Sequence, residues 1–146
     1  MSISSNVKTI ARDFMQVWSV GGESIVDILA AHDLTVFYSH FPAPAQGAEQ
    51  FKEILRQTHT SFPDLQLTVQ EVLGEGDQVV VKWRYQGTHQ EGELFGIKPR
   101  GQSVSVSGIT FLRVHNGKIV GESGIVDNFS LLQQLKAKSA RFQNGS

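Results

Sequence analysis

The stretch Lys118-Ile119-Val120-Gly121-Glu122-Ser123-Gly124-Ile125-Val126-Asp127 closes a run, 62–127, in which one strand-like segment follows another. It alternates with a period of two, which is typical of a strand with one buried face. Asp127 falls in register with Ile119, Ser123 and Ile125, and Glu122 falls in the opposite register. The alternation therefore predicts that Asp127 shares a face with apolar side chains. Because an unpaired buried charge is unfavourable, an acid in that position indicates a partner or a chemical role.

Four segments of this run have the composition of strands: 65–73, 78–89, 103–115 and 118–126. Turn sequences separate them, among them Gly74-Glu75-Gly76-Asp77 and His115-Asn116-Gly117-Lys118. Asn-Gly between two apolar runs is the strongest short signal for a hairpin. Long strands joined by hairpins predict a strongly curved antiparallel sheet.

The sequence before this run is mostly helical in pattern. Apolar residues recur every three or four positions over 4–20 and 48–60, and a shorter helix is expected over 23–31 with Ile25, Ile28 and Leu29 facing inward. A first strand is expected over 34–40, and Phe41-Pro42-Ala43-Pro44 ends it. A final helix is expected over 128–142. Helices grouped ahead of strands predict an α+β fold, with the helices packed on one side of a bent sheet.

Composition narrows the class of protein. A chain of 146 residues fits one domain, 1–146, and is long enough to bury a core. Thirteen basic against fourteen acidic residues indicate no nucleic-acid or anionic-membrane partner. There are no cysteines, and the five histidines lack metal-ligand spacing. No secretory signal or bilayer-spanning run is evident, so the expected location is the cytoplasm.

Several short motifs follow one another along nearly the whole chain: Tyr38-Ser39-His40, Gln46-Gly47, Phe62-Pro63-Asp64-Leu65, Gly76-Asp77-Gln78-Val79, Gly87-Thr88-His89, Gly117-Lys118-Ile119-Val120, Asp127 and Leu131-Leu132-Gln133-Gln134-Leu135. The ordered set resembles the SnoaL-like polyketide cyclase family, within the NTF2-like, ketosteroid isomerase-like superfamily. The resemblance implies a cone-shaped α+β barrel, in which a curved, mostly antiparallel sheet wraps around N-terminal helices and an internal pocket. It also implies a homodimer packed through the sheet.

The resemblance implies a function as well. An aspartate at the position of Asp127 acts in the family as general acid/base in an intramolecular aldol ring closure, without metal or organic cofactor. The implied ligand is small and apolar or polyketide-like. His40, also matched by the family pattern, is expected at the mouth of the pocket as a second catalytic group. A dry pocket would raise the pKa of such an aspartate toward a useful range.

The chain departs from the family pattern at two places. Members often carry His-Trp where this chain has Glu122-Ser123, and the segment after Gly87-Thr88-His89 is one residue longer than expected. Ser123 in place of a large aromatic residue would widen or reshape the cavity. The residues expected to contact a ligand are Trp18, Tyr38, Trp83, Tyr85, Phe111, Ser123 and Phe14, although aromatic residues at these spacings also serve as plain core.

Other readings of the same residues stay open. Asp127 is also a good N-cap for the helix that follows it, and His40 also fits a hydrogen-bonded surface residue. In the segment 78–89, either Val79, Val81, Trp83 and Tyr85 line the cavity, or the opposite face does. The second choice would bring Lys82 or Arg84 near Asp127, as in related epoxide hydrolases. Water addition of that kind is therefore an alternative function, and a non-catalytic ligand-binding or interaction module is another.

Overall fold

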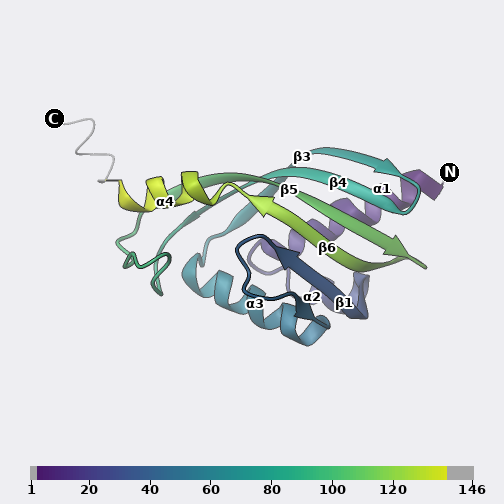
Figure 1. The fold of residues 1–146 in the computed structure, drawn as a ribbon, viewed down its shortest axis with the longest axis horizontal. Helices are drawn as coiled ribbons and strands as arrows, with labels where there is room; N and C mark the ends of the chain where they lie inside the picture. The colour runs from purple at the N-terminus through teal and green to yellow at the C-terminus, as the bar shows by residue number, and fades with distance from the viewer. Residues whose placement is uncertain (1–2, 138–146) are drawn as a thin grey trace.

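The computed structural model describes residues 3–137 of the chain. Its central element is a curved sheet that is open at both edges. Figure 1 shows α1, α2 and α3 on one side of the sheet, and α4 at the far end of the long strands. The elements, in chain order, are α1 (Ile3–Phe14), the 3-10 helix η1 (Met15–Trp18), α2 (Ser24–Leu29), β1 (Ala30–Tyr38), β2 (Ala45–Gln46), α3 (Ala48–Ser61), β3 (Gln66–Glu75), β4 (Gln78–Thr88), β5 (Ser103–His115), β6 (Lys118–Val126) and α4 (Asn128–Lys136).

The sheet confirms the predicted α+β class. Within residues 3–137 its strand order is β2-β1-β6-β5-β4-β3. Strands β1 and β6 are parallel, and the other neighbouring pairs are antiparallel. β2 and β3 remain as free edges, so the expected barrel is an unclosed, curved sheet. Its concave side faces the helices and carries the core.

The helices bury the stripes that their periodicity predicted. Val7, Ala11 and Phe14 of α1 are buried against the sheet, as are Phe51 and Leu55 of α3. The rings of Phe14 and Phe51 stack with centroids 6.1 Å apart, which joins the two helices at the centre of the core. In α2 the expected inward residue Ile28 is 64% exposed and Val26 is buried instead, because the helix ends early and β1 begins at Ala30.

Strand β6 contains a β-bulge that reverses its faces. Val114 of β5 pairs with Ile119, but Arg113 pairs with Gly121, which leaves Val120 as an extra residue on β6. One extra residue shifts the alternation of every side chain that follows. The prediction that Asp127 shares a buried face with Ile119 is therefore wrong.

Burial along β6 shows the reversal directly. Ile119 and Glu122 are buried, whereas Ser123, Ile125 and Asp127 are exposed. Glu122, which simple alternation places on the solvent side, is therefore the acid that is buried.

Two other boundaries differ from the prediction: the helix expected over 4–20 is α-helical only to Phe14 and continues as η1, and the strand expected over 34–40 is Ala30–Tyr38. β5 and β6 have the predicted bounds, and α3 extends one residue beyond its predicted end. The final helix is confirmed over Asn128–Lys136, and the part of that prediction from 138 onward lies outside the described residues. Across residues 3–137, no helix combines the length and apolar character needed to cross a bilayer.

Candidate functional site

A cavity of about 800 Å³ opens between α3, the concave side of the sheet and the start of α4. Its walls are mostly apolar or aromatic, with a polar side along α3 formed by Gln50, Glu53, Gln57, Thr58 and Ser61. The segment after β1 and the loop between β4 and β5 contribute further wall residues, among them Phe41, Leu94 and Phe95. A cavity of this size and lining suits a small organic ligand.

The structure gathers five of the predicted site residues at this cavity: Trp18, Tyr38, His40, Trp83 and Tyr85. Trp18 meets Tyr38 edge-on, with ring centroids 5.7 Å apart, and Trp83 stacks on Tyr85 at 5.9 Å. The apolar face of β4 therefore faces the cavity. Lys82 and Arg84 lie on the exposed face of that strand, and Arg84 donates a hydrogen bond to Ser105 Oγ.

Three residues that were expected to contact a ligand lie elsewhere. Phe111 and Ser123 are exposed cross-strand partners on the outer face of the sheet. The bulge explains Ser123, because it turns that side chain away from the concave side. Phe14 is fully buried in the core between α1 and α3. The expectation that these side chains line the pocket is corrected by their positions.

A buried polar network lies directly behind the aromatic wall. Tyr38 donates a hydrogen bond to Glu122 Oε2 over 2.5 Å, and the Trp18 indole N–H donates to the same oxygen over 2.9 Å. The Tyr38 hydroxyl is also 2.7 Å from Thr110 Oγ1, which accepts a hydrogen bond from the Trp83 indole at 2.8 Å. Three of these five residues, Trp18, Tyr38 and Trp83, also line the cavity.

Glu122 is the ionisable group at the end of this network. It is 3% exposed, and its Oε1 has no hydrogen-bond partner among the described residues. Burial raises the pKa of Glu122 to about 7, although the hydrogen bonds from Tyr38 and Trp18 oppose the rise. Burial and the neighbouring Glu122 hold the pKa of Tyr38 well above its ordinary value. Glu122 is therefore an acid that exchanges its proton near neutral pH.

Two strand glycines make room for the network. Tyr38 and Thr110 are both cross-strand partners of Gly124, one on each side of β6. Without a side chain at Gly124, the tyrosine ring reaches across the strand to the threonine hydroxyl. Gly108 is the partner of Trp83, and a Cβ there would lie 2.2 Å from the indole ring. At both glycines an aromatic ring comes so close to the backbone that a side chain would collide with it.

Asp127 lies at the end of β6, beside the cavity wall but exposed. Its Oδ1 accepts a hydrogen bond from the Ser130 backbone N–H at 3.1 Å, so the side chain caps α4. Its neighbours Val126 and Asn128 line the cavity, whereas Asp127 is not among the lining residues. The N-cap reading of Asp127 thus has direct geometric support.

His40 follows β1 and lies at the cavity wall as expected. Its ring meets Phe41 edge-on, with centroids 5.1 Å apart. Desolvation lowers the pKa of His40 from its ordinary value, so the neutral imidazole is favoured. Across residues 3–137, no three His, Asp or Glu side chains lie close enough together to hold a metal ion.

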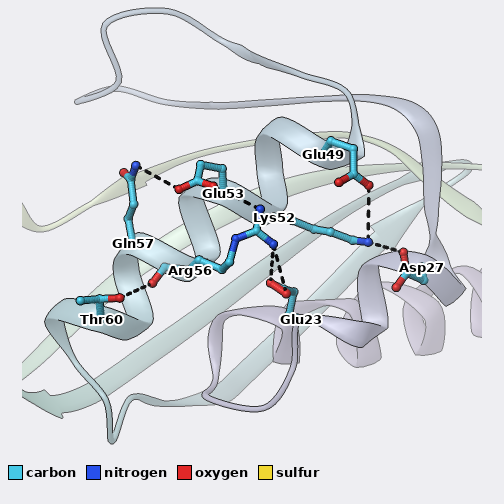
Figure 2. A network of polar contacts seen from close by, with 8 residues as sticks. All are labelled: Glu23, Asp27, Glu49, Lys52, Glu53, Arg56, Gln57 and Thr60. Atoms are coloured by element: carbon cyan, nitrogen blue, oxygen red, sulfur yellow. Dashed lines mark hydrogen bonds and ion pairs between the residues drawn. The ribbon is translucent and has the colours of Figure 1, made fainter.

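Ion pairs hold the α3 wall against α2 (Figure 2). Lys52 Nζ lies 2.5 Å from Asp27 Oδ1, and Arg56 Nη1 lies 3.2 Å from Glu23 Oε1. Arg56 also donates to Glu53 Oε1 at 3.2 Å, which partly balances the charge of a carboxylate at the cavity. Solvent screens ion pairs of this kind, so they add little to the stability of the fold.

Sequence reasoning missed Glu122 and Thr110 as parts of the site. Glu122 was assigned to the solvent face because the bulge at Val120 leaves no clear mark in the sequence. The glycines were a usable signal, since Gly108 and Gly124 interrupt otherwise strand-like segments. Glycine inside a strand often marks a close approach of another group.

Comparison with known proteins agrees with this architecture. The sequence model for SnoaL-like polyketide cyclases matches residues 8–135. A candidate SnoaL-like polyketide cyclase from Jannaschia sp. CCS1 has 25% identity, with 95% of this chain and 97% of that chain covered at a TM-score of 0.80. A candidate polyketide cyclase from Acidithiobacillus ferrooxidans has 29% identity, covering 93% and 98%, also at 0.80.

IdmH from Streptomyces antibioticus, a candidate polyketide cyclase, has 27% identity, with 90% of this chain and 99% of that chain covered at a TM-score of 0.74. No curated protein matched the sequence closely enough to count as a relative. The family match extends from α1 to α4 and so includes every strand of the sheet. The chain belongs to the SnoaL-like polyketide cyclase family.

Proposed function

We propose that this chain is an enzyme that moves protons at a carbon beside a carbonyl group in a small, largely apolar ligand. Ring closure of a polyketide by aldol condensation and isomerisation of a ketone are the two reactions of this kind that best suit the site. Both form an enolate whose charge the ligand itself delocalises. The residues assigned here require no metal or organic cofactor for that step.

One observation carries the proposal: Glu122 is a buried acid, bonded to two side chains of the cavity wall. A general base is most effective when its pKa lies near the working pH. Burial places the pKa of Glu122 at about 7. The carboxylate therefore has both a position behind the cavity and a suitable acidity.

Tyr38 is the connection between this acid and a ligand. It lines the cavity, and its hydroxyl already donates to Glu122. In the proposed step, the ligand C–H bond breaks and its proton passes to the Tyr38 oxygen while the Tyr38 proton passes to Glu122. The ligand becomes an enolate, Tyr38 is unchanged and Glu122 becomes neutral. After carbon–carbon bond formation, the proton returns by the reverse route to the new alkoxide.

The relay avoids a free tyrosinate. Burial and Glu122 raise the pKa of Tyr38, so an ionised phenol is unfavourable in this place. A concerted transfer through the hydroxyl needs no such intermediate. Trp18 assists by donating its N–H to the Glu122 carboxylate, which stabilises the ionised form that accepts the proton.

Asp127 and His40 remain alternative acid/base groups, as the family resemblance implies. Asp127 would act from the end of the cavity near Val126 and Asn128. His40 would act from the segment after β1, where the neutral imidazole is favoured. Each alternative assigns the reaction to a different residue, so single variants separate them.

The test uses deuterium exchange into 1-tetralone, an apolar aryl ketone whose background exchange is slow at neutral pH. Binding is measured first by quenching of the Trp18 and Trp83 fluorescence, and exchange at the carbon beside the carbonyl is then followed by NMR. We expect the wild-type protein to accelerate exchange and Glu122→Gln to remove at least about 99% of the acceleration. Asp127→Asn and His40→Gln serve as matched comparisons.

Two results would contradict the proposal. Tight binding with no acceleration would identify a ligand-binding module without catalysis. If the acceleration survives in Glu122→Gln but disappears in Asp127→Asn, the general base is Asp127 and not Glu122. Water addition receives no support from the β4 geometry, because Lys82 and Arg84 are on the exposed face of that strand.

We also infer that two copies of the chain pack through the outer face of the sheet. Phe37, Ile109, Phe111 and Ile125 are exposed on adjoining strands, between 38% and 67%. Phe37 and Phe111 are both cross-strand partners of Ser123, and Ile109 is the partner of Ile125, so the four side chains form one apolar patch. A contiguous patch of this kind marks an interaction surface.

A further inference from the structure

A chain of hydrogen bonds runs through the interior from one tryptophan to the buried acid. The Trp83 indole donates to Thr110 Oγ1, Thr110 Oγ1 contacts the Tyr38 hydroxyl, and Tyr38 donates to Glu122. All four residues are at most 3% exposed. Water therefore has little access to these bonds, and the protein itself decides where each proton lies.

The number of protons on Trp83, Thr110 and Tyr38 determines which group donates in each of these hydrogen bonds. An indole N–H only donates, so Thr110 Oγ1 accepts from Trp83. The single hydroxyl proton of Thr110 then has Tyr38 as its partner. Tyr38 accepts that proton and directs its own proton to Glu122, which agrees with the short 2.5 Å contact.

The opposite direction leaves a buried group without a partner. If Tyr38 donated to Thr110, the threonine oxygen would receive two donors and its own proton would have no acceptor among the hydrogen bonds of residues 3–137. A buried donor without an acceptor is unfavourable, because it has lost its hydrogen bond to water and gained none in return. Trp83 therefore acts through Thr110 to exclude the reversed arrangement.

We propose that Thr110 is a positioning residue that fixes the direction of these hydrogen bonds while Glu122 is ionised, so that the Tyr38 hydroxyl points its proton at Glu122 before the reaction. The inference rests on the proposed function for its catalytic meaning, but the bonding pattern stands without it. Thr110 is not among the residues that line the cavity, so it acts through Tyr38 and not on a ligand.

The effect of Thr110 reaches Glu122 through hydrogen-bond cooperativity. A hydroxyl that accepts a hydrogen bond becomes a stronger donor in its own bond. When Thr110 donates a hydrogen bond to the Tyr38 hydroxyl, Tyr38 therefore stabilises the Glu122 carboxylate more strongly than it would alone. Removing the threonine hydroxyl weakens this stabilisation and favours the protonated acid.

The test replaces the hydroxyl while keeping the shape of the side chain. Thr110→Val removes the hydroxyl, and Thr110→Ser keeps it as the matched control. Titration of Glu122 is followed, without ligand, by the infrared C=O stretch of its protonated carboxyl, identified by its disappearance in Glu122→Gln. We expect the midpoint to move to higher pH by about 0.5 to 1 pH unit in Thr110→Val and to stay at the wild-type value in Thr110→Ser.

Trp83→Phe provides an independent variant, because it removes the donor that fixes the direction while leaving the Thr110 hydroxyl in place. It should also move the midpoint upward, and it carries the test together with Thr110→Ser if Thr110→Val does not fold. The proposal is overturned if the midpoint is unchanged in Thr110→Val or in Trp83→Phe, or if Thr110→Ser moves as far as Thr110→Val. Ketone exchange is measured in a separate experiment, so the shift of the Glu122 midpoint can be interpreted even if the protein does not catalyse exchange.

Discussion

Tyr38 and Gly124 are cross-strand partners of β1 and β6, and a Cβ at Gly124 would lie 2.6 Å from Tyr38 Cε2. The ring therefore occupies the space that any other residue at position 124 would fill. The same missing side chain lets the Tyr38 hydroxyl meet Thr110 on the next strand. A backbone position thus determines the geometry of the buried polar network.

The first prediction concerns this contact. Gly124→Ala should push the Tyr38 ring away, weaken its bond to Glu122 and destabilise the protein by about 1–3 kcal/mol. Urea unfolding measures the change in the free energy of unfolding. Gly121→Ala is the matched control on the same strand, because the nearest atom to its added Cβ is Arg113 Cβ at 4.0 Å. Equal destabilisation by the two substitutions would contradict the steric argument.

The second prediction concerns the pH dependence of stability. Glu122 has a pKa of about 7 in the folded protein, against about 4.5 for an ordinary glutamate. The folded state thus binds more protons than the unfolded state between these values, so stability decreases as the pH rises from about 4.5 to about 7. Below that interval the stabilisation by the neutral carboxyl is fully present, and above it the loss is complete.

Glu122→Gln should remove this decrease, which is on the order of 3 kcal/mol. The measurement compares urea unfolding of wild type and variant across the same pH series, so that other titrating groups cancel. Glu71→Gln, at an exposed position on β3, is the control. Parallel curves for wild type and Glu122→Gln would show that Glu122 ionises normally.

The third prediction separates the structural role of Asp127 from a catalytic one. Asp127→Ala removes the cap of α4 and should lower stability by about 1 kcal/mol. Asp127→Asn keeps a capping oxygen and should leave both stability and ketone exchange close to wild type. Thermal unfolding and the exchange assay are the two measurements. Loss of exchange in a stable Asp127→Asn protein would establish the catalytic reading instead.

The fourth prediction concerns the apolar outer patch. Phe111→Lys or Ile125→Lys places a charge among exposed apolar side chains and should convert a dimer to a monomer. Light scattering gives the mass of each protein in solution. Ile28→Lys is the control, because Ile28 is also exposed, at 64%, but lies on α2, on the helical side of the sheet (Figure 1). A wild-type monomer would contradict the inferred packing.

Local patterns predicted most of the fold. The periodic stripe of α1 and the Asn116-Gly117 turn between β5 and β6 are short-range features, and both appear as expected. The class of the fold and most element boundaries followed from such features. Pairing across the sheet was different, since the parallel contact of β1 with β6 joins segments far apart in the chain.

The site was harder to predict than the fold. Tyr38 and Trp83 were named as ligand contacts because they are aromatic, and both line the cavity, although alternation alone left the face of 78–89 open. Glu122 was missed because its burial depends on one unpaired residue, Val120, which only the register with β5 reveals. The alternation within a single strand does not reveal a β-bulge, because a bulge is defined by pairing with the neighbouring strand.

The irregular residue has a consequence for how such sites change over time. β6 carries two acids in opposite phase, Glu122 before its end and Asp127 at its end. Deletion of Val120 would remove the bulge but leave Ile119 opposite Val114 and Gly121 opposite Arg113, so neither acid would change its face. Loss of this single codon would therefore leave the buried acid in place, with Glu122 inside and Asp127 at the start of α4.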